Sequence, residues 1–364
     1  MASSQYFRRH GRYRYIRRRK RAGSAGRWLA LAVLLFVLGQ WIGGGSLWDD
    51  GRTDIYGDPQ AVVQTGSGAD SQAIVQTGSG ADPQAIAQTG SGAGPQAVVQ
   101  TGSGADPQAG TPSETELWVD VLDCGQADTT LIRQGTHAML FDCGAGIPMQ
   151  IRQYLADAGV ERLEMVWLSH PDADHIGAFP SVSYGFPVGR VFVNGETKDT
   201  ESWSSVQEAI RYGNIPEQIP SPGETYSLGD AQITVLGPLR YYEDNPNNNS
   251  LAVKITFGRH SFLFCGDAQA EEEMDLVSGG MPVRCDVLHV NHHGSSDASC
   301  MDFLLKAHPA WAVISCGQGN DYGHPHDSTL RRLRQAGAQI LRTDESGTVR
   351  FRSDGETLRI QTER

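Results

Sequence analysis

Residues 169–177 read SHPDADHIG, and this stretch decides how the rest of the chain is interpreted. It follows a hydrophobic run, residues 165–168, that predicts a buried strand. Within six residues it carries four potential metal ligands: His170, Asp172, Asp174 and His175. Side chains two apart on an extended chain project to the same side, so the first three are expected to converge, with His175 completing the turn. Groups crowded this closely would repel and desolvate one another without a cation, so the segment predicts a metal centre.

The charges of the chain are distributed unevenly. Residues 1–27 contain ten Lys or Arg and no acid, whereas from Thr115 onward there are 19 basic and 34 acidic residues, a net charge of −15. The uncharged residues 28–48 would span about 31 Å as a helix, which predicts a transmembrane signal anchor; a cleaved signal peptide is the alternative. Because positive flanks stay in the cytoplasm, we expect a single-pass cell-membrane protein with an extracellular body, or a secreted one if cleavage occurs.

Residues 49–114 are predicted to link the anchor to the body. Within them, residues 59–106 are four copies of a twelve-residue unit such as PQAVVQTGSGAD. A repeat can indicate a solenoid, but each unit offers only two or three apolar side chains for each Gly-Ser-Gly break. This is too little to offset the entropy lost on ordering, so we interpret the segment as a flexible stalk of roughly 40 Å reach.

The body, residues 115–364, alternates short apolar runs with amphipathic segments. Its two strand-rich halves, with helices between the strands, predict an α/β fold, a four-layer αββα sandwich with loops converging on one edge. The last three runs, within residues 339–361, are expected to form a meander. All six cysteines fall in the body, four of them inside or at the ends of apolar runs, and we expect mainly free thiols. Since no CxxC pair occurs, a cysteine-type zinc site is not expected.

Seven motifs occur in a definite order along the body. They are DVLDCGQAD (120–128), FDCG (141–144), HPDADH (170–175), NNNS (247–250), CGD (265–267), NHHGS (291–295) and NDYGHP (320–325). With these motifs, residues 117–360 resemble the metallo-β-lactamase superfamily, and within it the hydrolase domain of ComEC-type DNA-uptake (competence) proteins. The resemblance implies the metallo-β-lactamase sandwich and a metal-dependent hydrolase.

The same resemblance implies a set of metal ligands. Asp267 is expected to bridge two metals. Asp142 is expected to orient the metal-binding side chains without binding the metal itself. One histidine of the pair 292–293 is expected to be a ligand and the other to assist or act as an acid, since neighbours on a strand point apart. In the superfamily pattern HxHxDH the second His is here Asp172, and more oxygen donors favour Mn²⁺ or Mg²⁺ over Zn²⁺. We expect one or two divalent ions, Zn or Mn, held by His170, Asp172, Asp174, His175, Asp267, His292 and His293.

Four further residues are substrate-binding candidates. Asn249 and Ser250 match the position where many superfamily members carry another His, which predicts a weaker metal site at His170 than at Asp174. Ser295 and His324 follow the NHHG and YG turns, and His324 could hold a phosphoryl oxygen or protonate a leaving group. The predicted catalytic residues are Asp174, His293 and His324.

The leading hypothesis is an extracellular, membrane-anchored phosphodiesterase or nuclease that uses a metal-bound hydroxide. The acidic body lacks the basic stripe of a tight DNA binder, so the substrate is either DNA gripped through metals and a local patch, or a small phosphodiester or nucleotide. Two alternatives stay open: a lactamase- or lactonase-type C–N or C–O hydrolase, and a non-catalytic surface binding module. The sequence identifies no protein partner, and the membrane is contacted through the anchor alone.

Overall fold

The computed structural model describes residues 74–77, 97–101, 112–144, 146 and 148–364. The basic tail, the predicted anchor and most of the predicted linker lie outside these ranges. Among the helices of the described ranges, none combines the length and the apolar character that a membrane span requires. All six cysteines are free thiols, and five of them are buried.

In the described part of the chain, the first β-sheet has ten strands in the order β1-β2-β17-β16-β3-β4-β5-β6-β7-β8. In chain order its strands are β1 (Ile74–Thr77), β2 (Ala97–Thr101), β3 (Leu117–Val121), β4 (Thr130–Gln134), β5 (His137–Phe141), β6 (Met165–Leu168), β7 (Val191–Val193), β8 (Glu217–Gln218), β16 (Val349–Ser353) and β17 (Leu358–Thr362).

The second sheet, within the same described ranges, has seven strands in the order β15-β14-β13-β12-β11-β10-β9. They are β9 (Thr225–Leu228), β10 (Ala231–Gly237), β11 (Ala252–Phe257), β12 (His260–Phe264), β13 (Val287–His289), β14 (Trp311–Ile314) and β15 (Gln339–Arg342). The helices are α1 (Pro148–Asp157), α2 (Ala173–Ile176), α3 (Phe179–Gly185), α4 (Glu201–Tyr212), α5 (Ala270–Ser278), α6 (Met301–Ala307), α7 (Asp327–Gln335) and α8 (Thr343–Ser346), with 3-10 turns η1 (Pro246–Asn249) and η2 (Asn291–Gly294).

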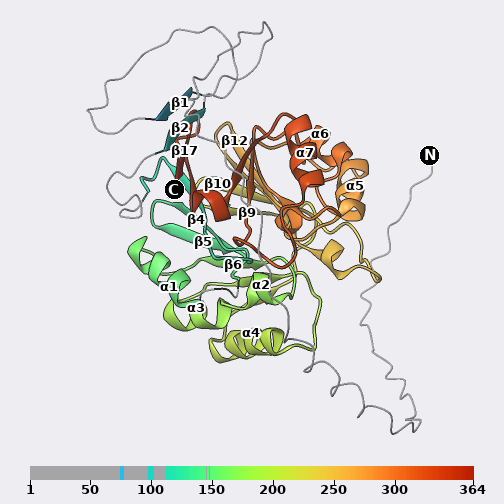
Figure 1. Cartoon of the computed structure of the whole chain (residues 1–364). Helices are drawn as coiled ribbons and strands as arrows, with labels where there is room; N and C mark the ends of the chain where they lie inside the picture. Colours follow the sequence, from blue (N-terminus) through green and yellow to red (C-terminus); the bar gives the residue numbers. More distant parts are fainter. Residues whose placement is uncertain (1–73, 78–96, 102–111, 145, 147) are drawn as a thin grey trace, which may run out of the picture. The chain divides into compact units, whose positions relative to one another are not determined.

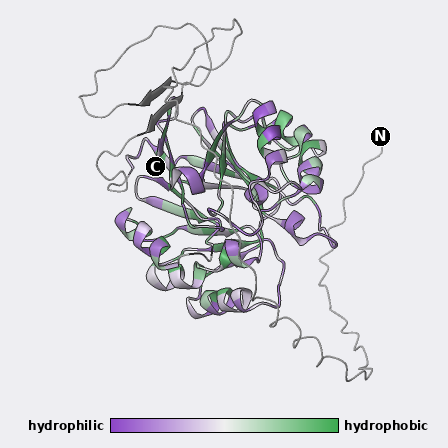
Figure 2. Cartoon of the chain, in the orientation of Figure 1, coloured by the Kyte–Doolittle hydropathy of each residue, from purple (hydrophilic) through white to green (hydrophobic). Residues whose placement is uncertain are grey.

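Three apolar clusters define the layers. One cluster lies between the two sheets and includes Trp167 and Phe264; a second joins the first sheet to α1, α3 and α4, and a third joins the second sheet to α5, α6 and α7. The two groups of helices lie on opposite sides of the sheets (Figure 1), and the hydrophobic residues concentrate in the strands between them (Figure 2). Strand β6 is buried along its whole length, as expected of a strand covered on both faces. The body is therefore the predicted αββα sandwich.

The parallel strands bring distant loops to one edge. Strand β6 is parallel to β5 and β7, and β12, β13 and β14 are parallel to one another. His170 follows β6, Asp267 follows β12, and η2 follows β13. Ligands of open α/β sheets bind outside the carboxyl ends of such strands, so the fold itself gathers these loops into one place.

Two local predictions were wrong. The tail is not one continuous meander: β16 and β17 form the expected antiparallel hairpin, but β15 extends the second sheet, and the short helix α8 lies between β15 and β16. The metal-binding segment is not extended either. Asp172 lies at the N-cap of α2 and Asp174 inside it, so the alternating projection expected of a strand does not apply.

The first sheet continues into the repeats. Strand β2 pairs in parallel with β17, and β1 pairs in parallel with β2. The register joins Ile74 to Val98, which are equivalent positions of the second and fourth repeats. For these short stretches the structure has strands where the sequence predicted a flexible stalk. The physical reason is that the outer edge of β17 offers backbone groups that another strand can pair with.

Candidate metal centre

The first group of site residues comes from the end of β6. After β6 the chain bends at His170 and Pro171, His170 is buried, and α2 starts at Ala173. The four-residue helix then carries Asp174 and His175, and the His175 side chain is fully buried. A short helix after a buried strand thus brings a carboxylate and an imidazole back towards the strand end.

Asp267 reaches the same point from the second sheet. It follows Gly266, which has φ +52° and lies so close to Ser169 that a Cβ atom would meet the Ser169 Cβ at 2.7 Å. Only glycine tolerates both this backbone angle and this approach. The CGD motif therefore allows the loops after β6 and β12 to touch.

The histidine pair lies in η2 and not in a strand. His292 and His293 have φ of 52° and 51°, in the left-handed region. This conformation is uncommon for non-glycine residues and marks a constrained turn. The expectation that both histidines extend a strand was wrong, because β13 already ends at His289.

Asp267 stands between two pairs of imidazoles. Its Oδ1 lies 3.0 Å from His175 Nε2 and 3.8 Å from His293 Nε2, which we call the inner pair. Its Oδ2 lies 3.7 Å from His170 Nε2 and 3.5 Å from His292 Nε2, which we call the outer pair. Asp174 belongs to the inner side, since its Oδ2 lies 3.3 Å from His293 Nε2 and 4.0 Å from His175 Nε2.

The polar atoms at the centre of this cluster lack hydrogen-bond partners among the described residues. They are buried atoms that face one another: His170 Nε2, His175 Nε2, His293 Nε2 and Asp267 Oδ1. Buried polar atoms left without partners are rare because each costs desolvation free energy. Imidazole nitrogens and carboxylate oxygens are the donors that bind Zn²⁺ and Mn²⁺. The donor set around Asp267 Oδ1 therefore fits a divalent cation, and His170 and His292 face the other oxygen of the same carboxylate.

Groups behind the inner pair fix the direction of its rings. Asp142 Oδ2 lies 2.8 Å from His175 Nδ1, and Asp142 also accepts hydrogen bonds from the backbone N–H and the hydroxyl of Ser169. The Nδ1 of His293 lies 3.1 Å from the Ser315 carbonyl oxygen. When each Nδ1–H donates to its oxygen, the lone pair of Nε2 points towards Asp267, as a metal ligand requires.

The outer pair is supported by neutral groups. The hydroxyl of Ser250 lies 3.4 Å from His170 Nδ1 and accepts a hydrogen bond from the Asp267 N–H. His292 lies 3.4 Å from the amide of Asn247 through Nε2 and 3.2 Å from the amide of Gln269 through Nδ1. The outer side is therefore built from amides and hydroxyls, where the inner side has carboxylates.

The pKa values also differ between the inner and the outer side of Asp267. Burial alone would raise the pKa of Asp267, but the imidazoles of His175 and His293 hold it well below its ordinary value. Burial alone would lower the pKa of His175 and of His293, but nearby carboxylates, Asp267 among them, raise both well above the ordinary value. His170 differs, because burial and the neighbouring His175 lower its pKa. Binding of a cation to the inner pair must therefore displace protons.

Three predicted site residues lie away from the centre. The Asp172 carboxylate, 32% exposed, is bonded to Lys198 at the rim. Asn249 is buried but holds the neighbouring loop, since its side chain bonds to the backbone of Tyr242 and to Glu196. Ser295 is buried, and its carbonyl oxygen accepts a bond from Thr329.

His324 lies beside the cluster. Its ring centroid is 5.6 Å from that of His292 and 6.2 Å from that of His293. Burial and these two imidazoles lower the pKa of His324 to about 4. The loop after β14 therefore reaches the site, and its imidazole is neutral near neutral pH.

The sequence interpretation missed Asp128. It is buried, and its Oδ1 and Oδ2 lie 3.4 Å from His293 Nδ1 and 3.9 Å from His175 Nδ1. Asp128 thus lies close enough to complete a buried group of four potential ligands with His175, Asp267 and His293. Because it faces the Nδ1 atoms, we assign it to orientation of the inner pair. The sequence signal that could have identified Asp128 is its position at the end of the motif DVLDCGQAD. His289 also approaches this carboxylate, with its Nε2 3.8 Å from Asp128 Oδ1.

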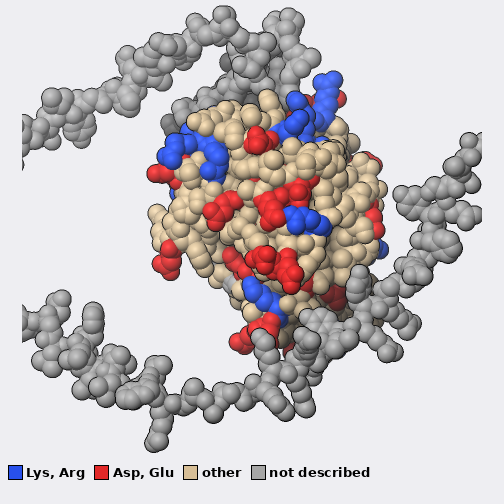
Figure 3. All heavy atoms as spheres, turned by 90° about the vertical axis from the view of Figure 1, so that its right-hand side faces the viewer, with Lys and Arg blue, Asp and Glu red and all other residues tan. Residues whose placement is uncertain are grey.

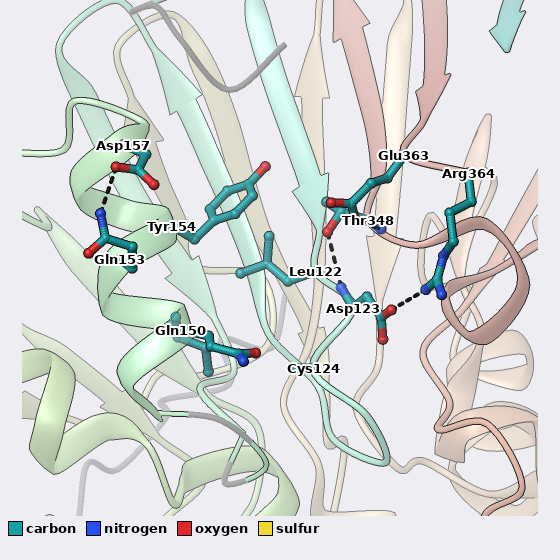
Figure 4. A pocket seen from close by; sticks show the side chains of 11 residues that line it. Leu122, Asp123, Cys124, Gln150, Gln153, Tyr154, Asp157, Thr348, Glu363 and Arg364 are labelled. Carbon is teal, nitrogen blue, oxygen red and sulfur yellow. Dashed lines mark hydrogen bonds and ion pairs between the residues drawn. The ribbon is translucent and has the colours of Figure 1, made fainter. Parts of the chain in front are cut away.

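A separate pocket of about 490 Å³ opens beside α1 and the C-terminus. Its polar side chains already pair with one another: Gln153 bonds to Asp157, and Asp123 bonds to Arg364 (Figure 4). None of the residues around Asp267 lines it. The chemistry of the molecule is therefore concentrated in the loops around Asp267 and not in this pocket.

Comparison with known proteins agrees with the site. Residues 122–317 match the metallo-beta-lactamase superfamily, and because this match covers more than half of the chain, the chain belongs to that superfamily. It therefore has the fold of a metal-dependent hydrolase, and its buried Asp and His cluster suits divalent metals. The metallo-β-lactamase fold protein YhfI from Bacillus subtilis is 14% identical, with a TM-score of 0.46, and the match covers 65% of this chain and 99% of that one.

The similar curated proteins are ComEC-like. ComE operon protein 3 of Bacillus subtilis (strain 168) is 28% identical over 254 residues, which is 64% of this chain and 33% of that protein. Competence protein ComA of Neisseria gonorrhoeae is 30% identical over 241 residues, 65% of this chain and 32% of that protein. The resemblance inferred from the motifs is confirmed. The chain matches about one third of the length of these relatives.

Proposed function

We propose that residues 115–364 are a metal-dependent phosphodiesterase. Its substrate is DNA, which would make it a nuclease, or a small phosphodiester or nucleotide. The observation that carries the proposal is the position of Asp267, whose two oxygens each face a different pair of imidazoles. Two cations side by side are a recurrent arrangement in enzymes that transfer phosphoryl groups.

The residues divide the work as follows. His175, His293 and Asp174 would hold one cation with Asp267 Oδ1, and His170 and His292 would hold the second with Asp267 Oδ2. When bound, such cations activate water and offset the negative charge that develops on phosphoryl oxygens. The surrounding chain keeps the ligands aimed, because Asp142 and the Ser315 carbonyl hold the inner rings by their Nδ1 atoms.

Nucleic acid as the substrate class is supported by the relatives and not by surface charge. The similar proteins are a ComE operon protein and a competence protein, and a recombination protein of Haemophilus influenzae is 28% identical over 252 residues. On the face shown in Figure 3, acidic side chains gather over the middle, and basic ones are scattered among and around them. A continuous basic stripe would be the footprint of a tight DNA binder. Bound cations would therefore hold the phosphate more than basic side chains would.

Hydrolysis by the purified full-length protein tests the proposal. Mn²⁺, Zn²⁺ and Mg²⁺ are each supplied with single-stranded DNA, with bis-p-nitrophenyl phosphate, and with nitrocefin as a lactam control. We expect both phosphodiesters to be cleaved with at least one metal and cleavage to stop on adding a chelator. Cleavage of nitrocefin alone would replace the proposal with the lactamase-type alternative.

We further propose that the body acts outside the cell, attached through residues 28–48. The support is the charge asymmetry, with ten basic residues before this segment and an acidic body after it. Protease added to intact cells is expected to trim the body. Protection of the body until lysis would reverse the topology.

A further inference from the structure

Three aromatic rings, those of Tyr322, His324 and His293, lie in succession between the protein surface and the His and Asp side chains around Asp267. Tyr322 is 67% exposed, and its ring lies over that of His324 at a centroid distance of 5.6 Å and an interplanar angle of 25°. His324 in turn lies 6.2 Å from His293 at an angle of 22°. Three nearly parallel rings thus connect solvent to one of the inner imidazoles.

The loop that carries Tyr322 is held in place from within. The Asn320 side chain donates to the carbonyl oxygens of Gly317 and His324 at 2.9 and 2.6 Å, and it accepts from the His324 N–H at 3.0 Å. The base of the loop is fixed as well, because Gly317 N–H donates to the side chain of Gln126 at 3.0 Å. The rings are therefore presented by a preorganised turn, which lowers the entropy lost when a ligand binds.

Because Tyr322 is 67% exposed, its ring offers surface to another planar group. Base–aromatic stacking needs no cationic side chain and tolerates any base, because every base has a π-face. This suits an acidic body in which salt-dependent phosphate contacts are scarce. A stacked base must be free of its pairing partner, which favours single-stranded nucleic acid over an intact duplex.

We propose that Tyr322, backed by His324, is the platform on which a nucleobase of a single-stranded substrate stacks while a phosphodiester a few nucleotides along the same strand lies at the metal cluster. A stacked strand rises about 3.4 Å for each nucleotide, so a few nucleotides cover the two ring spacings of 5.6 and 6.2 Å. This inference rests on the proposed phosphodiesterase activity and adds its substrate class.

Two substrates that differ only in their bases test the inference. The full-length protein, supplied with the metal that supports cleavage, is given a single-stranded oligodeoxynucleotide and an oligomer of the same length built from abasic residues. We expect the wild type to cleave the natural oligomer with a kcat/KM about tenfold or more above that of the abasic one, as stacking of one base allows.

Three variants assign the effect to the ring. Tyr322→Ala should lower kcat/KM for the natural oligomer about tenfold and leave the abasic oligomer unchanged, and Tyr322→Phe should restore cleavage because it keeps the ring. Tyr212→Ala is the matched control, since Tyr212 ends α4 and is 86% exposed; it should change neither rate.

The outcomes separate the two proposals. If Tyr322→Ala cleaves the natural oligomer as well as the wild type, or if both oligomers lose cleavage equally, the platform is refuted while the phosphodiesterase stands. If the wild type cleaves bis-p-nitrophenyl phosphate but neither oligomer, the platform is refuted while the phosphodiesterase stands; if it cleaves none of the three, both proposals fail.

Discussion

The inner and outer sides of Asp267 use similar ligands in different surroundings. On the inner side both imidazoles are buried, and carboxylates lie behind them: Asp142 beside His175, and Asp128 beside both. On the outer side His292 is 20% exposed, and the supporting groups are two hydroxyls, of Ser169 and Ser250, and two amides. A carboxylate behind an imidazole raises its basicity as a ligand and fixes its ring. From this difference we expect tighter metal binding on the inner side than on the outer side, where His292 is partly exposed.

The largest effect is expected from Asp267→Ala, which removes the group shared by both sides. Phosphodiester hydrolysis should fall below detection, and bound metal should be lost, while the far-ultraviolet circular dichroism stays that of the folded protein. Metal analysis and the hydrolysis assay on the same preparation measure this. Near-wild-type hydrolysis would place the activity at another site or in a contaminant.

Equal truncations compare the two sides directly. His293→Ala should cost about 10²–10³-fold in kcat and remove metal from the inner site, whereas His292→Ala should cost about tenfold and keep that metal. The physical reason is that only His293 has its Nδ1 held by the protein's own backbone, at Ser315. If both variants lose the same amount of metal and the same activity, the inner and outer sides are equivalent and the proposed difference between them is wrong.

Among the residues that hydrogen-bond to the ligand imidazoles, a change on the inner side should likewise have a larger effect than one on the outer side. Asp142→Asn keeps the shape and suits the φ of 56° at this position, but it removes the charge that holds His175. We expect metal affinity to fall about 10–100-fold, as for other groups behind ligands. Ser250→Ala, the counterpart behind His170, should change affinity less. Titration of metal-free protein with Mn²⁺ or Zn²⁺ gives both numbers, and a larger loss for Ser250→Ala would contradict the ranking.

The smallest effect concerns stability beneath the outer side. Glu272 is buried in α5, its backbone N–H faces Asn248 of η1 at 3.4 Å, and burial raises the pKa of its carboxyl well above the ordinary value. The folded state thus binds this proton more tightly than the unfolded state. Its contribution to stability is fully present below the ordinary Glu pKa and is lost as the pH rises through the raised pKa.

Glu272→Gln should remove this pH dependence. We expect the melting temperature to rise by about 2–4 °C at about pH 8, equivalent to about 1 kcal/mol, and to change little at about pH 4. Thermal unfolding at both pH values measures it. Glu271→Gln is the control, because Glu271 is exposed and paired only with Arg240 at the surface. A Glu272→Gln variant with the wild-type slope would show that Glu272 is not the group that titrates.

Local sequence patterns predicted the parts of the site that depend on neighbours in the chain. The apolar run before Ser169 indicated a buried strand, which the structure confirms, and the ligand-rich turn after it is a local feature; His170 and His175, predicted as metal ligands, are both buried there. Asp172 shows the limit. It lies in the same run of letters, yet a helix that starts immediately after it turns its carboxylate to Lys198 at the rim.

Contacts between distant segments could not be derived in this way. Asp128 precedes His293 by more than a hundred residues, and nothing local indicates that its carboxylate lies 3.4 Å from that ring. The two histidines of η2 were assigned to a strand, because a left-handed φ at non-glycine residues is imposed by the surrounding packing and not by their own preference.

The sequence by itself indicated a metal site after the apolar run at residues 165–168, because four potential ligands crowd into residues 170–175 and burying such groups without a cation is costly. The places of Asp267 and of the pair 292–293 in the ligand set came from the ordered motifs and the family resemblance that they carry. Only the tertiary structure decided that Asp267 divides the cluster into an inner and an outer side and that Tyr322 stacks on His324. Those relations join loops from both sheets, and distances between loops are set by how the two sheets pack across their shared core.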